Sequence, residues 1–347
     1  MAPRLKRPRL EDGSTYGELQ EAALDEQVGL KQPKPHEKLW YDDGSIVLAT
    51  DVHLYRVHKS ILAQYSTVFK DMLDIPTGDG SRADEGGIVS AERWDGLPLV
   101  RMAGDSDEDV YHLLMALYNR EYHQITKPTS LPIILALLNL STKYDIPVIR
   151  REVIQHLAIY YPSESEKWVN VHETPLFGEI YDTPKDANFQ LLISARRCNA
   201  GPILPMLFYS CAIESLDTIF NHLHQLDATD LKRIISGREL LLTTWIPLFG
   251  TRVLRPQQRC KSAACSDARI RMFAHWVESC ESESRKFPLA ACCGGLRGIG
   301  NEEEYKKLCT FCINESTDSL DFFESTFWDV LPFIFALDEW DELNKDI

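Results

Sequence analysis

Four of the nine cysteines occur in two pairs whose spacing could build a metal site. Cys260 and Cys265 have four residues between them, and Cys309 and Cys312 have two. Structural zinc prefers four thiolates in a tetrahedron, so the two pairs together could hold one ion. The competing interpretation is that these thiols are free and pack as small apolar side chains. The loose spacing of the first pair leaves both alternatives open.

The secondary structure predicted around the second pair argues against zinc. Residues 301–314 have a continuous helical pattern, and Cys309 and Cys312 would lie late in that helix. Cys292 and Cys293 are adjacent, which favours a local packing or turn feature, since nothing in the sequence points to an oxidising compartment. No metal and no other cofactor is therefore expected.

Other patterns that carry chemistry are absent from the sequence. There is no G-x-x-x-x-G-K-S/T phosphate loop, no G-x-S-x-G elbow and no H-E-x-x-H helix. His222 and His224 would point about 200° apart on a helix, so they could not chelate one ion together. A glycine-rich stretch without dinucleotide-binding order is interpreted as a flexible turn; it contains Gly294, Gly295, Gly298 and Gly300. The chain is therefore expected not to be an enzyme.

The charge balance limits the partners of this 347-residue chain. Its formal net charge of −15 disfavours nucleic acid, because phosphate binding draws on Lys and Arg. No apolar run reaches the ~18 residues that span a bilayer, and no apolar core follows the basic N-terminus as in a secretory signal. We expect a cytoplasmic or nuclear protein with reduced thiols, protein partners and no membrane contact.

Residues 1–35 are predicted to be a disordered tail, because apolar residues are sparse and have no sustained periodicity. The tail opens with a basic cluster of the kind associated with nuclear import, formed by Arg4, Lys6, Arg7 and Arg9. The alternative is a solvated basic terminus without a signalling role.

Residues 36–160 are predicted to form an α+β domain. A hairpin is expected from strands at 45–50 and 52–57, and a third strand over 97–102. Residues 74–96 are rich in Gly, Asp and Glu, which predicts a long surface loop. Ser106 and Asp109 form a capping box at the start of one helix. The helices are expected at 58–65, 66–73, 106–118, 131–144 and 147–160.

Residues 161–347 are predicted to be a helical C-terminal region without an internal repeat. Its packing is expected to be anchored by Trp276, Trp328 and Trp340. The helices are expected at about 186–198, 202–215, 229–247, 266–281, 301–314 and 318–337.

The predicted α+β domain resembles the BTB/POZ family over about residues 38–160. The order and spacing of its strands and helices agree with that family. Four motifs carry the resemblance in register: Asp43-Gly-Ser-Ile-Val-Leu; Tyr55-Arg-Val-His-Lys-Ser-Ile-Leu62 with Ser66-Thr-Val-Phe69 and Met72; Val110, Leu113-Leu114 and Leu117-Tyr118; and Lys143-Tyr144-Asp-Ile-Pro147.

The whole chain resembles the expanded fungal BTB proteins, in which a helical tail follows the domain. The matching tail segments are Leu308-Cys309-Thr-Phe-Cys312 and Trp328-Asp-Val-Leu-Pro332-Phe-Ile-Phe335-Ala-Leu337. The chain departs from the family in its 74–96 insertion, in Asn119-Arg120 where members often have Thr-Gly, and in having no zinc-finger or kelch-type array. The insertion leaves the geometry of any dimer or ligase contact near it undetermined.

This resemblance implies a BTB/POZ fold, which is a small, mostly antiparallel sheet flanked by helices, followed by an all-α region. It also implies homo- or hetero-dimerisation, of which a homodimer is expected, and recruitment of a cullin-type ubiquitin ligase as a substrate adaptor. An alternative is a nuclear scaffold linked to transcription or chromatin, without a DNA-binding domain of its own. The interaction residues that the resemblance suggests are Trp40, Asp43, His58, Lys59, Ile61, Leu62 and Tyr65. For the apolar members of the two helices at 58–73, burial in the core is the competing interpretation.

Overall fold

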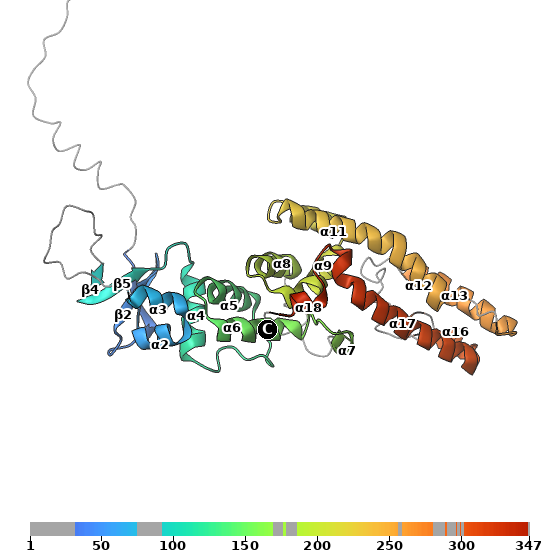
Figure 1. Ribbon diagram of the computed structural model, residues 1–347, viewed down its shortest axis with the longest axis horizontal. Coiled ribbons are helices and arrows are strands. Elements are labelled where there is room, and N and C mark those ends of the chain that lie inside the picture. The colour runs from blue at the N-terminus through green and yellow to red at the C-terminus, as the bar shows by residue number, and fades with distance from the viewer. Residues whose placement is uncertain are drawn as a thin grey trace, which may run out of the picture. The chain divides into compact units, whose positions relative to one another are not determined.

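The computed structural model in Figure 1 describes residues 32–74, 92–168, 176–177, 186–255, 259–279, 289, 296, 299 and 302–345. The described chain is α+β, as the sequence predicts, and it divides into two compact units. The sheet unit contains residues 32–57 and 92–107, and the helical unit contains the other described residues. Several sequence predictions lie outside the described residues: the basic cluster, Cys292-Cys293, the glycine-rich stretch, and most of the 1–35 tail and of the 74–96 loop.

The sheet unit contains one mixed five-stranded sheet with the strand order β1-β3-β2-β5-β4. The pairs β2–β3 and β4–β5 are antiparallel, whereas β1–β3 and β2–β5 are parallel. The expectation of a mostly antiparallel sheet is therefore wrong. Only the two locally connected hairpins are antiparallel, because a parallel neighbour needs a longer connection. The strands are β1 (Lys34–Trp40), β2 (Ile46–Ala49), β3 (His53–Val57), β4 (Arg93–Trp94) and β5 (Leu97–Arg101).

The central strand β2 explains why the hairpin prediction is correct. All four of its residues are buried, as expected for an apolar, β-branched run covered on both faces. Val47, Ala49 and Leu54 form an apolar cluster of the two hairpin strands, and Trp40 packs against it. The hairpin register pairs Ile46 with Val57.

Strands β1 and β4 were missed in the sequence. Lys34 and Pro35 belong to β1, although the sequence predicts a tail to residue 35. Only Leu39 of β1 is buried, so the strand has no alternating apolar pattern. Its position depends on backbone pairing instead, as in the 3.0 Å hydrogen bond from the Lys34 amide to the Val52 carbonyl. The short strand β4 falls within the segment predicted as a loop. Both of its residues are exposed.

The Asp107 carboxylate joins three residues of the hairpin. It accepts hydrogen bonds from the Thr50 hydroxyl and, at 2.9 Å, from the Tyr55 hydroxyl, and it lies 2.7 Å from Nδ1 of His53. Burial acts to raise the pKa of Asp107, but these hydrogen bonds outweigh burial and hold the pKa below its usual value. The carboxylate therefore stabilises the hairpin through all three of these contacts.

The first helices of the helical unit agree with the sequence prediction. The Phe69 amide donates to the Ser66 hydroxyl at 3.0 Å, which confirms Ser66 as a cap. The apolar residues of α5 are largely buried, as expected for a central helix. These helices are α2 (Lys59–Tyr65), α3 (Thr67–Asp74), α4 (Asp107–Tyr118, whose first residue belongs to the sheet unit), α5 (Leu131–Lys143) and α6 (Pro147–Ala158).

The remaining helices correct several predicted boundaries. One helical run covers 228–253 through α11, η4 and α12, where the sequence predicts a helix over 229–247. The predicted helix at 301–314 is wrong, because α16 ends at Lys306 and α17 begins at Thr310. These elements are α7 (Ser165–Trp168), α8 (Ala187–Arg197), the 3-10 helix η3 (Gly201–Ile203), α9 (Leu204–Ala212), α10 (Leu216–Asn221), α11 (Ala228–Leu240), the π-helix η4 (Leu241–Trp245), α12 (Ile246–Val253), α13 (Ala263–Ser279), α16 (Glu302–Lys306), α17 (Thr310–Ile334) and α18 (Trp340–Leu343).

The predicted tryptophan anchors are confirmed. Trp276 is 5% exposed, and its ring centroid lies 4.9 Å from that of Phe249. Trp328 stacks on Trp340 with centroids 6.0 Å apart, and its indole N–H donates to the Ser163 carbonyl at 3.0 Å. These contacts connect α17 with α18 and with the segment that precedes α7.

A buried histidine pair predicts pH-dependent stability. Nε2 of His123 lies 3.0 Å from Nδ1 of His156, whose side chain is fully buried. Burial, followed by the proximity of His123, lowers the pKa of His156 to about 4. The unfolded chain takes up this proton near its ordinary pKa of about 6.5, so stability falls as the pH drops from about 6.5 towards about 4. At about pH 5 the expected loss is about 2 kcal/mol.

Urea unfolding of the wild type and a His156→Gln variant between about pH 7 and about pH 5 measures this effect. The difference in stability between the two proteins is expected to shrink by about 2 kcal/mol across this range, because glutamine does not titrate. His224→Gln is the matched control, since His224 is exposed. Parallel pH dependences of the wild type and His156→Gln would contradict the assignment.

Candidate functional site

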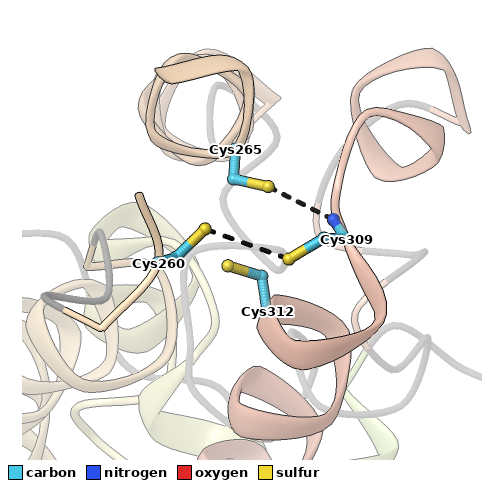
Figure 2. Close-up of side chains that lie close together, drawn as sticks. All are labelled: Cys260, Cys265, Cys309 and Cys312. Carbon is cyan, nitrogen blue, oxygen red and sulfur yellow. Dashed lines mark hydrogen bonds between the residues drawn. The ribbon is translucent and has the colours of Figure 1, made fainter. Parts of the chain in front are cut away.

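Four cysteine thiols from distant parts of the sequence converge in the helical unit. The sulfurs of Cys260, Cys265, Cys309 and Cys312 all lie within 4.8 Å of one another. Figure 2 shows the four side chains turned toward a common point, with Cys265 on one helix and Cys312 on another. The Sγ atoms of Cys260 and Cys309 are 3.9 Å apart. The structure thus brings together the two pairs that the sequence identifies.

The break between α16 and α17 places the second pair. Helix α16 ends in a tight turn, in which the Leu308 amide donates to the Tyr305 carbonyl at 3.1 Å. The next amide, that of Cys309, donates to Sγ of Cys265 at 3.2 Å instead of continuing the helix. Cys309 has an extended backbone and is the N-cap of α17, so Cys312 lies in the first turn of that helix. The helix expected over 301–314 is interrupted because a tertiary acceptor, the Cys265 thiol, replaces a helical carbonyl.

Both pairs lie at helix N-termini, and Cys265 and Cys312 are each the third residue of a helix. Cys265 is the third residue of α13, which begins at Ala263, and Cys260 precedes that helix. Amide groups and the positive end of the helix dipole favour negative charge at such positions. The Cys312 backbone amide is the main cause that lowers the pKa of Cys309 to about 7. Burial is the main cause that raises the pKa of Cys312 to about 12.

A buried arginine lies beside the cysteines and was missed in the sequence. Arg269 of α13 is 1% exposed. Its guanidinium donates to the carbonyls of Arg255 at 2.6 Å, Cys312 at 2.8 Å and Val253 at 3.3 Å, and also to the Ser316 hydroxyl. It thereby joins the end of α12 to α13 and α17. A signal exists in the sequence, since Arg269 interrupts the helical apolar stripe of Cys265, Ala268, Met272 and Trp276.

The Arg269 charge has no carboxylate partner within ion-pair distance in the described part of the chain. The nearby Glu304 pairs instead with Arg271 at 2.9 Å and Lys307 at 2.7 Å. Buried charges in proteins are ordinarily paired or hydrogen-bonded. Here the arginine is compensated by backbone carbonyls, one of which belongs to Cys312.

Two of the predicted interaction residues lie in the sheet unit. Trp40 ends β1, is half-buried and covers the apolar cluster of the hairpin. Asp43 is exposed in the turn before β2. The neighbouring Gly44 is required there, because a Cβ atom would lie 2.7 Å from Cγ of Arg56. The Arg56 side chain holds this turn by donating to the Gly44 carbonyl at 3.1 Å.

The other five predicted interaction residues lie on or beside α2 in the helical unit. His58 is the N-cap, and its backbone amide donates to the Tyr118 hydroxyl at 2.8 Å. Leu62 is fully buried, so it belongs to the core, as the competing interpretation holds. The remaining three are half-buried and leave part of their side chains at the surface: Lys59, Ile61 and Tyr65.

The predicted separation of His222 and His224 is consistent with the structure. The His222 ring stacks on Phe189 with centroids 4.2 Å apart, whereas His224 is exposed in the turn that follows α10. His222 thus contributes to packing.

Comparison of the chain with protein-family models, curated proteins and solved structures finds no match. Among the helices that the structure describes, none combines the length and the apolar character needed to cross a membrane.

Proposed function

We propose that this chain is a non-enzymatic protein-interaction module, whose BTB/POZ-like residues 36–160 self-associate and whose helical region presents or binds a partner. The observation that carries the proposal is the element order between Ile46 and Ala158. Two hairpin strands are followed by two short helices, the strand pair β4–β5 and three longer helices. Apart from the short strand β4, this is the order that the sequence resemblance implies.

The motif residues occupy structural positions, which supports the resemblance as one of fold. Tyr55 is fully buried in the sheet unit. In the helical unit, Phe69 stacks on Tyr144 with centroids 4.7 Å apart, and the Ser66 hydroxyl donates to the Tyr144 carbonyl. The second motif therefore packs against the Lys143-Tyr144 motif, which lies more than 70 residues later.

Two polar clusters among the described residues hold the fold together, which favours interaction over catalysis. Asp107 accepts hydrogen bonds from the hairpin, and the His123–His156 pair is buried. A catalytic group needs a free atom open to substrate, whereas the Asp107 carboxylate already accepts hydrogen bonds from the hairpin and the two imidazoles are buried.

Exposed apolar side chains in the helical region support a protein partner. Leu216, Phe220 and Leu223 follow one another at helical spacing along α10 and just beyond it, and each is 42% to 50% exposed. Exposed apolar residues that recur on one face are typical of protein contacts.

Recruitment of a cullin-type ubiquitin ligase is the specific adaptor role that we propose for the module.

Size-exclusion chromatography with light scattering of the full chain tests self-association. A dimer is expected at tens of micromolar, and a strict monomer would count against the proposal. Tyr65→Glu is expected to weaken the dimer at least ~10-fold, because a charge replaces a half-exposed aromatic residue on α2. Gln64→Glu, on the exposed side of the same helix, is the matched control and is expected to leave the dimer intact.

Two further experiments separate the roles that such a module could have. Capture of a purified cullin by the wild-type chain, and its loss in Tyr65→Glu, would support the ligase adaptor. A fluorescent fusion lacking residues 1–10 tests the nuclear scaffold: loss of nuclear signal would favour it, and unchanged localisation would remove the basic cluster as its support.

A further inference from the structure

We propose that Cys260, Cys265, Cys309 and Cys312 bind one structural Zn²⁺ that joins the N-terminal ends of α13 and α17. A tetrahedral zinc with Zn–S bonds of about 2.3 Å requires sulfurs about 3.8 Å apart. The Cys260–Cys309 separation of 3.9 Å already meets this requirement. The full set, within 4.8 Å, would have to contract by no more than about 1 Å.

The exposure of the cysteines separates zinc binding from simple packing. Cysteines that serve as small apolar residues are buried, as Cys198 and Cys211 are in this chain. In the four-cysteine cluster, Cys309 is exposed and Cys260 is half-exposed. Two disulfides would also use all four thiols, but these cysteines are free in the structure. Four sulfur donors in this arrangement suit zinc, with iron as the competing ion.

Hydrogen-bond donors and a buried cation lie beside the sulfurs. The Cys309 amide donates to Sγ of Cys265, and Cys265 and Cys312 lie in the first turns of α13 and α17, where the positive end of the helix dipole favours negative charge. Four thiolates and one Zn²⁺ carry an excess of two negative charges. The buried Arg269 guanidinium, bonded to the Cys312 carbonyl at 2.8 Å, supplies positive charge directly beside them. Such hydrogen-bonded neighbours orient metal ligands and support binding.

The ion would connect parts of the chain that are far apart in sequence. Cys265 and Cys309 are separated by 44 positions. Closing such a long loop restricts the unfolded chain, and binding of the metal couples directly to folding. We therefore expect metal removal to loosen the ends of α13 and α17.

Metal analysis of the purified full-length chain tests the proposal. About one zinc per chain is expected in the wild type and in Cys198→Ala, and less than about a tenth in Cys309→Ala. Cys309 is exposed, so its replacement leaves the apolar core unchanged. Cys198→Ala is the matched control, since that cysteine lies outside the cluster. A chelator is expected to lower the thermal midpoint of the wild type by about 10 °C or more, and to leave that of Cys309→Ala unchanged.

Cobalt titration gives a readout that requires no variant. Apo protein loaded with Co²⁺ is expected to develop the sulfur-to-cobalt charge-transfer and intense visible bands of a tetrahedral thiolate site. Less than half an equivalent of zinc, iron in its place, equal zinc in Cys309→Ala, or cobalt bound without these bands would each overturn the proposal. A disulfide among the four cysteines in freshly purified protein would overturn it as well.

Discussion

Arg269→Met is expected to lower the free energy of unfolding of the helical unit by about 3 kcal/mol or more. Methionine matches the length of the arginine stem, but it leaves the Arg255 carbonyl without its donor and the Val253 carbonyl with only the Ser316 hydroxyl. These carbonyls lie at the C-terminal end of α12, where the helix supplies no donors of its own. Each buried acceptor without a partner costs about 1–3 kcal/mol. The unpaired Arg255 carbonyl and the lost hydrogen bonds to Val253, Cys312 and Ser316 together outweigh what is gained by removing a buried charge.

Urea unfolding followed by tryptophan fluorescence measures this change, because Trp276 and Trp328 report on α13 and α17. Arg269→Lys is expected to be intermediate, since one ammonium cannot serve four acceptors. Arg252→Met is the control on the same bundle, because Arg252 is exposed, and its effect is expected to stay within about 0.5 kcal/mol. If Arg269→Met and Arg252→Met were equally stable, the bridging role of Arg269 would be wrong.

Phe327→Ala is expected to destabilise the helical unit by about 3–5 kcal/mol. Phe327 on α17 is fully buried. Its ring forms T-shaped pairs with two aromatic rings from other helices, with centroids 5.0 Å from Trp245 and 6.0 Å from Tyr209. The side chain thus ties α17 to the π-helix η4 and to α9. Truncation would leave a cavity that a packed helical interface fills only in part.

Phe322→Ala provides a matched comparison on the same helix, five residues earlier. Phe322 is 72% exposed, so its removal is expected to change stability by less than about 0.5 kcal/mol. Thermal or urea unfolding of the two variants side by side would show the contrast. Equal losses of stability would mean that α17 does not pack through the face that contains Phe327.

Local patterns predicted most of the first half of the chain. The hairpin, the two helices that follow it and α4 to α6 occupy the ranges that periodicity and caps indicate. In α6 the predicted apolar face, Ile149, Val153, Ile154 and Leu157, is buried. Val68 is an exception: it belongs to the apolar face predicted for α3 and is 41% exposed. A stripe of apolar residues predicts a helix better than it predicts which member faces the core.

The predictions that failed concern interactions between residues distant in sequence. Strand β1 has little side-chain pattern, because its position depends on pairing with β3. The residues of α16 do not predict where that helix ends. The Cys309 amide donates to the thiol of Cys265, which belongs to α13. The burial of Arg269 likewise depends on carbonyls contributed by α12 and α17.

The α+β class, the order of the hairpin and of helices α2 to α6, and the two cysteine pairs follow from the sequence, because each depends on periodicity, caps and residue type over short stretches. The tertiary structure alone shows that the pairs meet at one point, that the sheet is mixed, and that Phe327 is core whereas Phe322 is surface. The four cysteines converge because the N-terminal ends of α13 and α17 lie close together. The positions of these helix ends depend on contacts between segments distant in sequence, which local sequence patterns do not predict.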